Sequence, residues 1–291
     1  MPIAMNAIAL APEVLYPIPN VNDAAQHVAL VRRAADGWSR GENVLDLWVP
    51  AFELGLPQFL DYQHLPHVAV VALGRLTGGS IDLRTLFDVV RYVLLLTFPL
   101  TVFWSMRTMG FTPVASAIAA AASSLLSGDH RYGFEYDSYV WRGFGMFTQL
   151  FAMHLTFIAL ATVHRVADRG TGIVVAALAC AALGLSHLIY AYMMAITGLV
   201  LLLFGMTRAN VTARVRHLSL VGAIAAAASS YMWLPFFIHA AYVNASPYLA
   251  QEKYDSFGAG PILSWLVSGE LFDHRRVPVL TLLFAAGAVC T

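Results

Sequence analysis

An aspartate and a histidine in the first polar stretch of the chain have a spacing that suits acid–base chemistry. Asp23 and His27 are four residues apart, and on a helix two such residues share one face. A carboxylate and an imidazole placed together in this way can work as a pair. Asp23 is equally suited to capping the helix that follows it, because aspartate at such a site commonly accepts backbone hydrogen bonds. Both roles can hold at once.

A second acidic group lies in a polar and aromatic segment, residues 128–143. Glu135 and Asp137 are separated by one tyrosine, and two carboxylates at this spacing in a loop can bind a divalent cation such as Mg²⁺ or Mn²⁺. Aromatic side chains in the same segment, Trp141 among them, offer flat faces to a sugar ring or a lipid. For an isolated pair of carboxylates, a solvated loop with interfacial aromatic residues is the simpler interpretation.

Three charged residues lie on one face of an otherwise apolar segment: Arg84, Asp88 and Arg91. A charge at the centre of a bilayer costs about 2.5–3.5 kcal/mol on insertion scales, so such groups need a reason to be there. Asp88 can simply neutralise both arginines. Alternatively, the arginines can hold the phosphate of a lipid-linked substrate through charge-assisted hydrogen bonds. Arg91 is the deeper of the two and the better candidate for that second role.

His187 lies where two apolar segments meet with almost no linker. A single histidine at such a position is more often a packed or capping group than a catalytic one, and it is kept here as a candidate for substrate contact. The sequence contains no phosphate-cradling glycine loop, serine-centred hydrolase elbow or HExxH motif. The common soluble-enzyme motifs therefore do not account for these polar residues.

Composition indicates the class of protein in which these residues must work. Of the 291 residues, 59% are hydrophobic and only 12% are charged, with a formal net charge of zero. A soluble protein is about a quarter charged, and several apolar segments here approach or exceed the ~18 residues of a transmembrane helix. Zero net charge gives no electrostatic case for nucleic acid as a partner. The sequence predicts an all-α, polytopic transmembrane helix bundle in contact with membrane lipid.

The apolar pattern divides the chain into two parts. Residues 1–82 form a long loop with juxtamembrane helices near 22–37 and 64–76, and residues 83–291 form the bundle. The expected full spans are 83–106, 112–127, 144–163, 172–186, 188–206 and 218–238. The apolar segments at the two ends of the chain are too short to cross a bilayer. We therefore expect a fragment that lacks an upstream anchoring helix and ends inside a downstream one.

Basic residues predict which side of the membrane each connection faces. The turns at 107–111, 164–171 and 207–217 hold six arginines and one aspartate. The segments 128–143 and 239–276 hold seven acidic and five basic residues. This is the positive-inside pattern. It predicts a multi-pass protein of the cytoplasmic membrane whose first loop is extracytoplasmic.

Two segments of the first loop resemble a known superfamily. They read PNVNDAAQH (residues 19–27) and GENVLDLWVPAFELGLPQFLDYQHLPHVAVVAL (residues 41–73). They resemble the first outward loop of the GT-C superfamily of integral-membrane glycosyltransferases, and in particular uncharacterised bacterial and archaeal membrane proteins related to it. In that group an acidic residue precedes a G-x-P-x-F-x-x-Y segment, which here runs from Gly55 to Tyr62. An acidic pair in the second loop corresponds to Glu135 and Asp137.

The resemblance implies a GT-C-like transferase that moves a sugar from a polyprenyl-phosphate donor to an extracytoplasmic acceptor, with inversion. It implies that Asp23 is the general base, with His27 beside it, or else a metal ligand. The leaving phosphate is then expected near Arg91 or Arg84. The candidate metal ligands are Asp23, Glu135 and Asp137. The candidates for substrate contact are Arg84, Arg91, Glu135, Asp137, Tyr62, Trp141 and His187.

Two other function classes compete with transfer. A non-enzymatic GT-C-like protein that binds or presents a lipid or a polysaccharide is the main alternative. A transporter needs a continuous polar path, and the inner halves of the expected spans contain little polar material. We therefore rank the transporter last.

Overall fold

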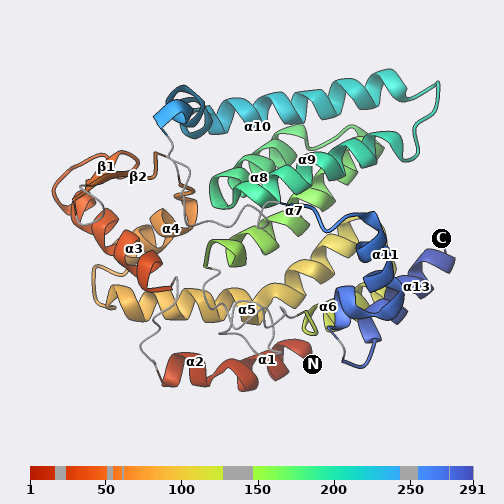
Figure 1. Cartoon of the computed structure of the whole chain (residues 1–291), viewed down its shortest axis with the longest axis horizontal. Helices are drawn as coiled ribbons and strands as arrows, with labels where there is room; N and C mark the ends of the chain where they lie inside the picture. Colours follow the sequence, from red (N-terminus) through yellow and green to blue (C-terminus); the bar gives the residue numbers. More distant parts are fainter. Residues whose placement is uncertain are drawn as a thin grey trace.

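The computed structural model describes most of the chain: residues 1–16, 24–50, 55–60, 62–126, 147–242, 255–274 and 276–290. These residues are mostly helical, and a single two-stranded sheet is the only sheet among them. Figure 1 shows the longer helices stacked in layers, with shorter helices at both ends of the chain placed around them. The predicted all-α class is therefore confirmed.

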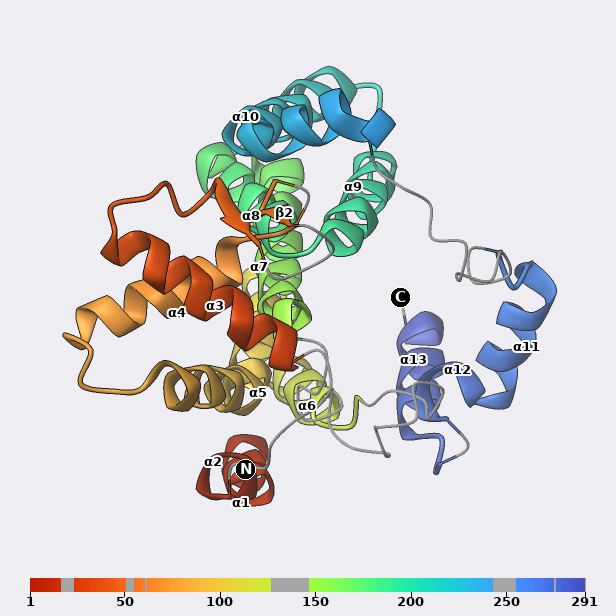
Figure 2. The ribbon, with the colours of Figure 1, turned by 60° about the vertical axis from the view of Figure 1, so that its left-hand side comes forward.

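The largest group of helices begins at Leu83. Its elements are α5 Leu83–Thr108, α6 Pro113–Ser123, α7 Phe147–Arg169, α8 Ile173–Ser186, α9 Leu188–Leu203, α10 Val211–His239 and the 3₁₀ turn η3 Ala240–Tyr242. Helix α8 packs between α7 and α10, and α5 packs against α6 and α7. Three short helices follow in the chain: α11 Ala259–Ser268, α12 Glu270–Asp273 and α13 Val279–Cys290. Figure 2 shows these last helices to one side of the main group.

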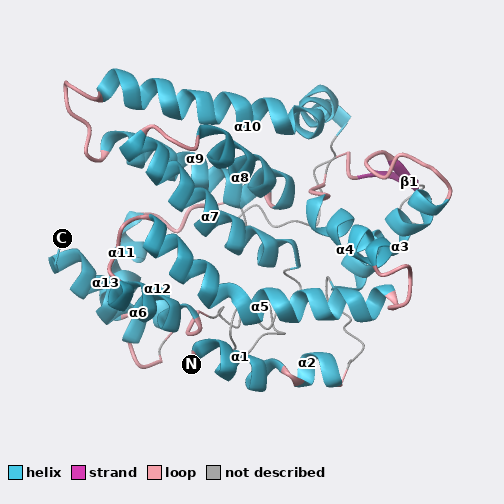
Figure 3. Ribbon diagram, turned by 180° about the vertical axis from the view of Figure 1, so that it is seen from behind, coloured by secondary structure: helices cyan, strands magenta, loops and turns pink. Residues whose placement is uncertain are grey.

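The residues before Leu83 form shorter elements around α5. They are α1 Pro2–Leu10, α2 Pro12–Leu15, α3 Ala24–Ser39, β1 Leu47–Val49, β2 Leu56–Gln58 and α4 Leu65–Leu76. Helices α1 and α2 lie on one side of α5, and α3 and α4 lie on the other side (Figures 1 and 3). Two helices were expected near 22–37 and 64–76, and α3 and α4 confirm both.

Three of the described helices are long and apolar enough to cross a membrane. They are α5, α7 and α10 with its 3₁₀ extension, Val211–Tyr242. Helices α6, α8 and α9, which were also expected as full spans, have only 11, 14 and 16 residues. Each is shorter than the ~18 residues that a spanning helix needs. The number of crossings and the sidedness of the loops stay predictions.

Small side chains allow α7 and α8 to pack closely. Ala159, Ala176 and Ala177 are fully buried in one apolar core that also takes in α9 and α10. Alanine contributes no side-chain bulk beyond Cβ, so helix backbones that meet through it can approach each other. Larger apolar side chains on the outer faces of α9 and α10 remain exposed. These exposed apolar faces suit contact with lipid rather than with water.

Helix α5 has a capping residue at its start and a proline in its interior. The Asp82 carboxylate accepts hydrogen bonds from the backbone N–H groups of Arg84 (3.0 Å) and Thr85 (3.2 Å), which caps the helix. Pro99 lies inside the helix, and proline removes one backbone hydrogen bond from the helical ladder. Figure 1 shows α5 changing direction along its length. Both features follow from the residue types at these positions.

The hairpin β1–β2 was not predicted, because residues 38–61 were expected to be irregular. Its strands have three residues each and pair antiparallel, with Trp48 opposite Pro57. Gly55 has a positive φ of 103°, and a Cβ atom added to it would lie 2.5 Å from the Trp48 indole. Only glycine fits such a conformation and such a close approach. Short strands that contain proline carry too weak a pattern to be recognised from sequence.

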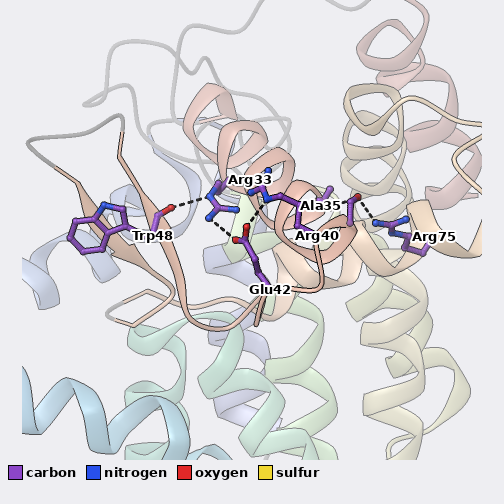
Figure 4. Close-up of polar contacts among 7 residues, drawn as sticks. Arg33, Ala35, Arg40, Glu42, Trp48 and Arg75 are labelled. Carbon is purple, nitrogen blue, oxygen red and sulfur yellow. Dashed lines mark hydrogen bonds and ion pairs between the residues drawn. The ribbon is translucent and has the colours of Figure 1, made fainter.

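Surface polar contacts attach the hairpin to α3 and α3 to α4 (Figure 4). The Arg33 guanidinium donates from Nε to the carbonyl of Trp48 (3.0 Å) and from Nη2 to Glu42 (2.8 Å). Arg75 of α4 donates to the Ser39 hydroxyl at the end of α3 (2.6 Å). These exposed contacts fix the register of the hairpin against the helix rather than contributing much stability.

Candidate functional site

Three histidines and two tyrosines from separate segments lie together where α3, α4 and the end of α10 approach each other. His27 Nδ1 is 3.0 Å from His67 Nε2, and the Tyr231 hydroxyl is 2.7 Å from His64 Nε2. The Tyr62 ring lies 5.9 Å from the His67 ring, edge-on. We call these five residues the histidine cluster. The cluster joins the first loop to α10, since His64 and Tyr231 are 167 residues apart in the chain.

The local sequence explains why the histidines face inward. His27 lies on the buried face of α3 with Val31 and Ala34, which follow it at four and seven residues, the spacing of one helical face. Pro66 is in the first turn of α4, where its missing N–H costs nothing, so the helix starts there. His67 therefore points into the same apolar core as His27. Their side chains are 5% and 0% exposed.

The segment that resembles the G-x-P-x-F-x-x-Y motif supplies the wall of the cluster. Gln58 donates from Nε2 to the Leu30 carbonyl of α3 (2.9 Å). The Phe59 ring lies 5.3 Å from the His67 ring and 6.0 Å from the His64 ring. Phe59 has a φ of +68°, and a bulky residue in the left-handed region carries backbone strain. Strain of this kind concentrates at functional sites, where the surrounding structure holds it in place.

Burial determines the charge of the cluster. Desolvation lowers the pKa of His64 to about 4. Desolvation also holds the pKa of His67 well below the ordinary histidine value, and the neighbouring His27 adds to that effect. His64 and His67 are therefore neutral at pH 7. A neutral imidazole has one donor and one acceptor nitrogen, so the tautomer of His67 decides whether its Nε2 donates to His27 or accepts from it.

An ion-pair network lies on α5 beside the cluster. The Asp88 carboxylate is 2.9 Å from Arg84 Nε and 3.5 Å from Arg91 Nη2. Arg91 Nη2 is also 3.6 Å from the Glu13 carboxylate of α2. Asp88 therefore pairs with both arginines, as expected if its role is to neutralise their charges. The role of either arginine in binding phosphate stays a prediction.

The two arginines differ in access. The Arg84 side chain is 27% exposed, whereas that of Arg91 is 5% exposed and contacts two carboxylates. A phosphate reaching Arg91 must therefore compete with two buried acids, whereas Arg84 offers donors at the surface. Arg84 is thus the more accessible of the two arginines.

An aromatic layer separates the network from the histidines. Phe87, which precedes Asp88, lies 4.2 Å from Phe147 between ring centroids. The Phe147 ring in turn lies 5.6 Å from His27 and 5.8 Å from His67. The charged network and the histidine cluster therefore border the same apolar core.

Four of the sequence-predicted site residues lie outside the described part of the chain: Asp23, Glu135, Asp137 and Trp141. The described residues that directly follow their segments, Ala24 and Phe147, are both buried in one apolar core with the fully buried Phe87. Within the described ranges, no group of three or more histidine, cysteine, aspartate or glutamate side chains could hold a metal ion. The proposed cation site is therefore untested by the structure.

His187 lies at the junction of α8 and α9. Its backbone is extended, with φ of −161° and ψ of 114°, which separates the two helices. Its ring packs edge-on against Tyr190 with the centroids 5.0 Å apart. This is the packed position that a single histidine at a junction usually takes, and its contact with substrate stays a prediction.

Sequence reasoning missed His64, His67, Tyr231, Gln58 and Glu13 as members of the site. A signal for two of them existed, since His64 and His67 are three residues apart at the start of a helix and so lie on neighbouring positions of its first turn. Tyr231 and Glu13 gave no such signal, because only the tertiary packing of α10 and α2 brings them to the site.

Comparisons with known proteins identify no relative of this chain: no family model, no curated protein and no solved structure matches it. The resemblance to GT-C glycosyltransferases therefore rests on the sequence segments themselves.

Proposed function

We propose that this protein is a GT-C-like membrane glycosyltransferase that moves a sugar from a polyprenyl-phosphate donor to an extracytoplasmic acceptor. One observation carries the proposal: the buried hydrogen bond between His27 and His67 (3.0 Å). Its first partner, His27, is in the first turn of α3, four residues after Asp23 in the sequence. Burying polar rings costs free energy unless they are hydrogen-bonded, and a satisfied buried polar pair is held in one geometry.

In this proposal Asp23 is the general base. It takes the proton of the acceptor hydroxyl as that oxygen forms a bond to the anomeric carbon of the sugar. The bond between that carbon and the phosphate oxygen breaks, and its electron pair leaves with the phosphate, so the anomeric configuration inverts. His27 and His67 are positioning residues that orient the base.

The leaving phosphate needs cationic donors. Arg84 supplies them at the surface of α5, since its side chain is partly exposed and has a single carboxylate contact within the described residues. Arg91 does not contact the phosphate in this proposal; it holds the Asp88 carboxylate, which in turn contacts Arg84. An arginine fork suits a phosphate because it presents parallel N–H donors.

The donor can be identified directly from the lipids that co-purify with the full-length protein. Mass spectrometry of an organic extract is expected to show a polyprenyl-phosphate sugar that is lost from an Arg84→Gln variant and retained in an Arg107→Gln control on the opposite end of α5. An extract that holds only ordinary phospholipid in wild type and both variants would argue against the transferase.

A second function, non-enzymatic binding of a lipid or a polysaccharide, is favoured by the pairing of Arg91 with two carboxylates. That pairing holds α2 against α5 in a fixed arrangement, which binding needs but which does not imply a catalytic reaction. This function predicts that Asp23→Ala and Glu135→Ala leave binding unchanged, whereas substitution of Trp141 or Arg91 weakens it. Binding of the co-purified glycan or lipid to each variant distinguishes the two functions.

A further inference from the structure

A polar cavity of about 390 Å³ lies at the other end of α7 from the histidine cluster. It is formed by the last turn of α7, the end of α9 and the first turns of α10. Helix α7 has 23 residues, so the two sites are separated by ~33 Å along it at 1.5 Å per residue. The volume is within the range of small-ligand sites, about 300–1,000 Å³. None of the residues assigned to the transferase lines it.

The cavity is rich in groups that favour an anion. Its titratable lining consists of one acid and four basic residues: Asp168, Arg169, Arg214, His164 and His217. The turns that form it also carry further arginines, and they are the turns that the sequence predicts to be cytoplasmic. Basic pockets between membrane helices on that side are suited to the head groups of anionic lipids.

Arg214 is the buried cation of this cavity. It is 8% exposed, and its guanidinium donates to three carbonyls, those of Ala167 (3.0 Å), Leu201 (2.7 Å) and Phe204 (2.8 Å). It thereby joins the ends of α7 and α9. Its Nε has no hydrogen-bond partner within the described part of the chain, and no carboxylate there lies within ion-pair distance of it. A buried positive charge without a carboxylate favours an anionic ligand.

An apolar groove of about 490 Å³ lies between α8, α9 and α10. Small residues make this groove, and two of them leave open space where a side chain would be. A Cβ atom added to Gly198 of α9 or Gly222 of α10 would have no neighbouring atom within 4 Å. Large apolar side chains at these positions would fill the groove, so the glycines keep it open.

The polar cavity and the apolar groove adjoin each other. Leu201 lines the cavity and Leu202 the groove, and on α10 Arg214 and His217 line the cavity while the adjacent Val215 and Leu218 line the groove. The groove continues along α10 as far as Trp233, ~27 Å from Val215 at 1.5 Å per residue. This length is close to the ~30 Å thickness of a bilayer's hydrocarbon core. A polar, basic space followed by an apolar one fits an amphiphile with an anionic head.

We propose that the cavity and the groove together bind one anionic diacyl phospholipid. Its phosphate lies in the cavity near Arg214 and Arg169, and one acyl chain lies in the groove between α9 and α10. The excess of basic over acidic side chains selects an anionic head group over a zwitterionic one. The site requires that these helices be embedded in a membrane, but it does not depend on the transferase activity.

The test uses the purified full-length protein, delipidated in detergent and then mixed with phosphatidylglycerol or phosphatidylcholine of the same chain length. Native mass spectrometry is expected to show roughly tenfold greater retention of phosphatidylglycerol, as two arginines near a phosphate would give. Equal retention of the two lipids would overturn the proposal. So would displacement of bound phosphatidylglycerol by an equimolar amount of a polyprenyl phosphate.

Two variants separate the head-group site from the groove. Gly222→Leu fills the groove and is expected to reduce phosphatidylglycerol retention at least fivefold, whereas Gly287→Leu on α13, which also meets open space, leaves it unchanged. Arg169→Gln combined with His217→Gln is expected to reduce the preference for the anionic lipid, since Arg214 remains. Retention in Gly222→Leu equal to that in Gly287→Leu, with both proteins folded by circular dichroism, would contradict the proposal.

Discussion

His27 Nδ1 lies 3.0 Å from His67 Nε2, and this hydrogen bond joins the first loop's helix α3 to its second helix α4 inside an apolar core. Forty residues separate the two histidines in the chain. Because the burial of His67 disfavours its charged form, a proton on one ring of the pair fixes the donor and acceptor positions of the other. A site next to this pair would thus have defined hydrogen-bonding groups.

Replacing His67 by phenylalanine keeps a ring of similar size and removes the hydrogen bond. In the proposed transferase the turnover number should fall by roughly 10²-fold, the lower end of what a positioned acid–base group contributes, with less change in the KM for the lipid donor. Sugar release from a polyprenyl-phosphate sugar measures both parameters.

The control for that variant is His239→Gln, since His239 is exposed at the end of α10. It should leave turnover and its pH profile as in wild type. If His67→Phe lowers the melting temperature but leaves the turnover number of the folded fraction intact, the pair is structural and the positioning role is wrong.

The stability of the protein should fall as the solution is acidified below pH 6.5. His64 binds a proton at about pH 4 when folded but near 6.5 when unfolded, so the unfolded state takes up more protons between these values. The free energy of unfolding is therefore flat above pH 6.5 and decreases toward pH 4, by roughly 3 kcal/mol for this group. His67 contributes in the same direction.

Thermal unfolding in detergent at a series of pH values tests this dependence. The His64→Gln variant should show a shallower decrease than wild type, and His239→Gln should show the same decrease as wild type. A melting temperature that stays constant from pH 7 to pH 4.5, or identical slopes in all three proteins, would contradict the neutral buried state of His64.

Gly55 should not tolerate a side chain. An alanine there would have a positive φ of 103° and a Cβ atom 2.5 Å from the Trp48 indole, and overpacking of this kind costs about 1–3 kcal/mol. Gly79→Ala is the matched control, since its φ is +74° but its Cβ would meet nothing within 4 Å. Chemical denaturation should show the larger loss for Gly55→Ala. Equal losses would mean that only the backbone conformation matters.

Asp88 should matter more to folding than an exposed acid does. Asp88→Asn removes a carboxylate that contacts two arginines on α5, and breaking a buried ion pair costs about 3–5 kcal/mol. Because Glu13 remains near Arg91, we expect the lower end of that range. Glu42→Gln, which removes an exposed partner of Arg33, should cost less than about 1 kcal/mol. Comparable losses in the two variants would show that burial does not control these pairs.

The helices were predictable from sequence because their signals are local. Asp82 as a cap, Pro66 in the first turn of α4 and the apolar period of α3 each act within a few residues, and the structure shows all three. The break between α8 and α9 at His187 was also predictable, because two apolar segments, 172–186 and 188–206, meet there. The end of α9 was less predictable: the helix ends at Leu203, and apolar composition does not reveal that end.

The site was only partly predictable, because its residues come together through tertiary packing. His27 was identified from its spacing to Asp23, yet its hydrogen-bonded partner is a histidine on another helix rather than a sequence neighbour. Tyr231 reaches His64 only because α10 passes over the first loop's helices. Likewise, Glu13 joins Arg91 through the packing of α2 on α5. Pairings of this kind leave no periodic trace in a single sequence.

The most direct test of the transferase is the Asp23→Asn variant of the full-length protein, assayed with the polyprenyl-phosphate sugar that co-purifies with it. The substitution keeps the size and the capping ability of the side chain and removes only its basicity. We predict normal expression and membrane insertion with at least a hundredfold loss of sugar transfer. Undiminished transfer by Asp23→Asn would contradict the proposed mechanism.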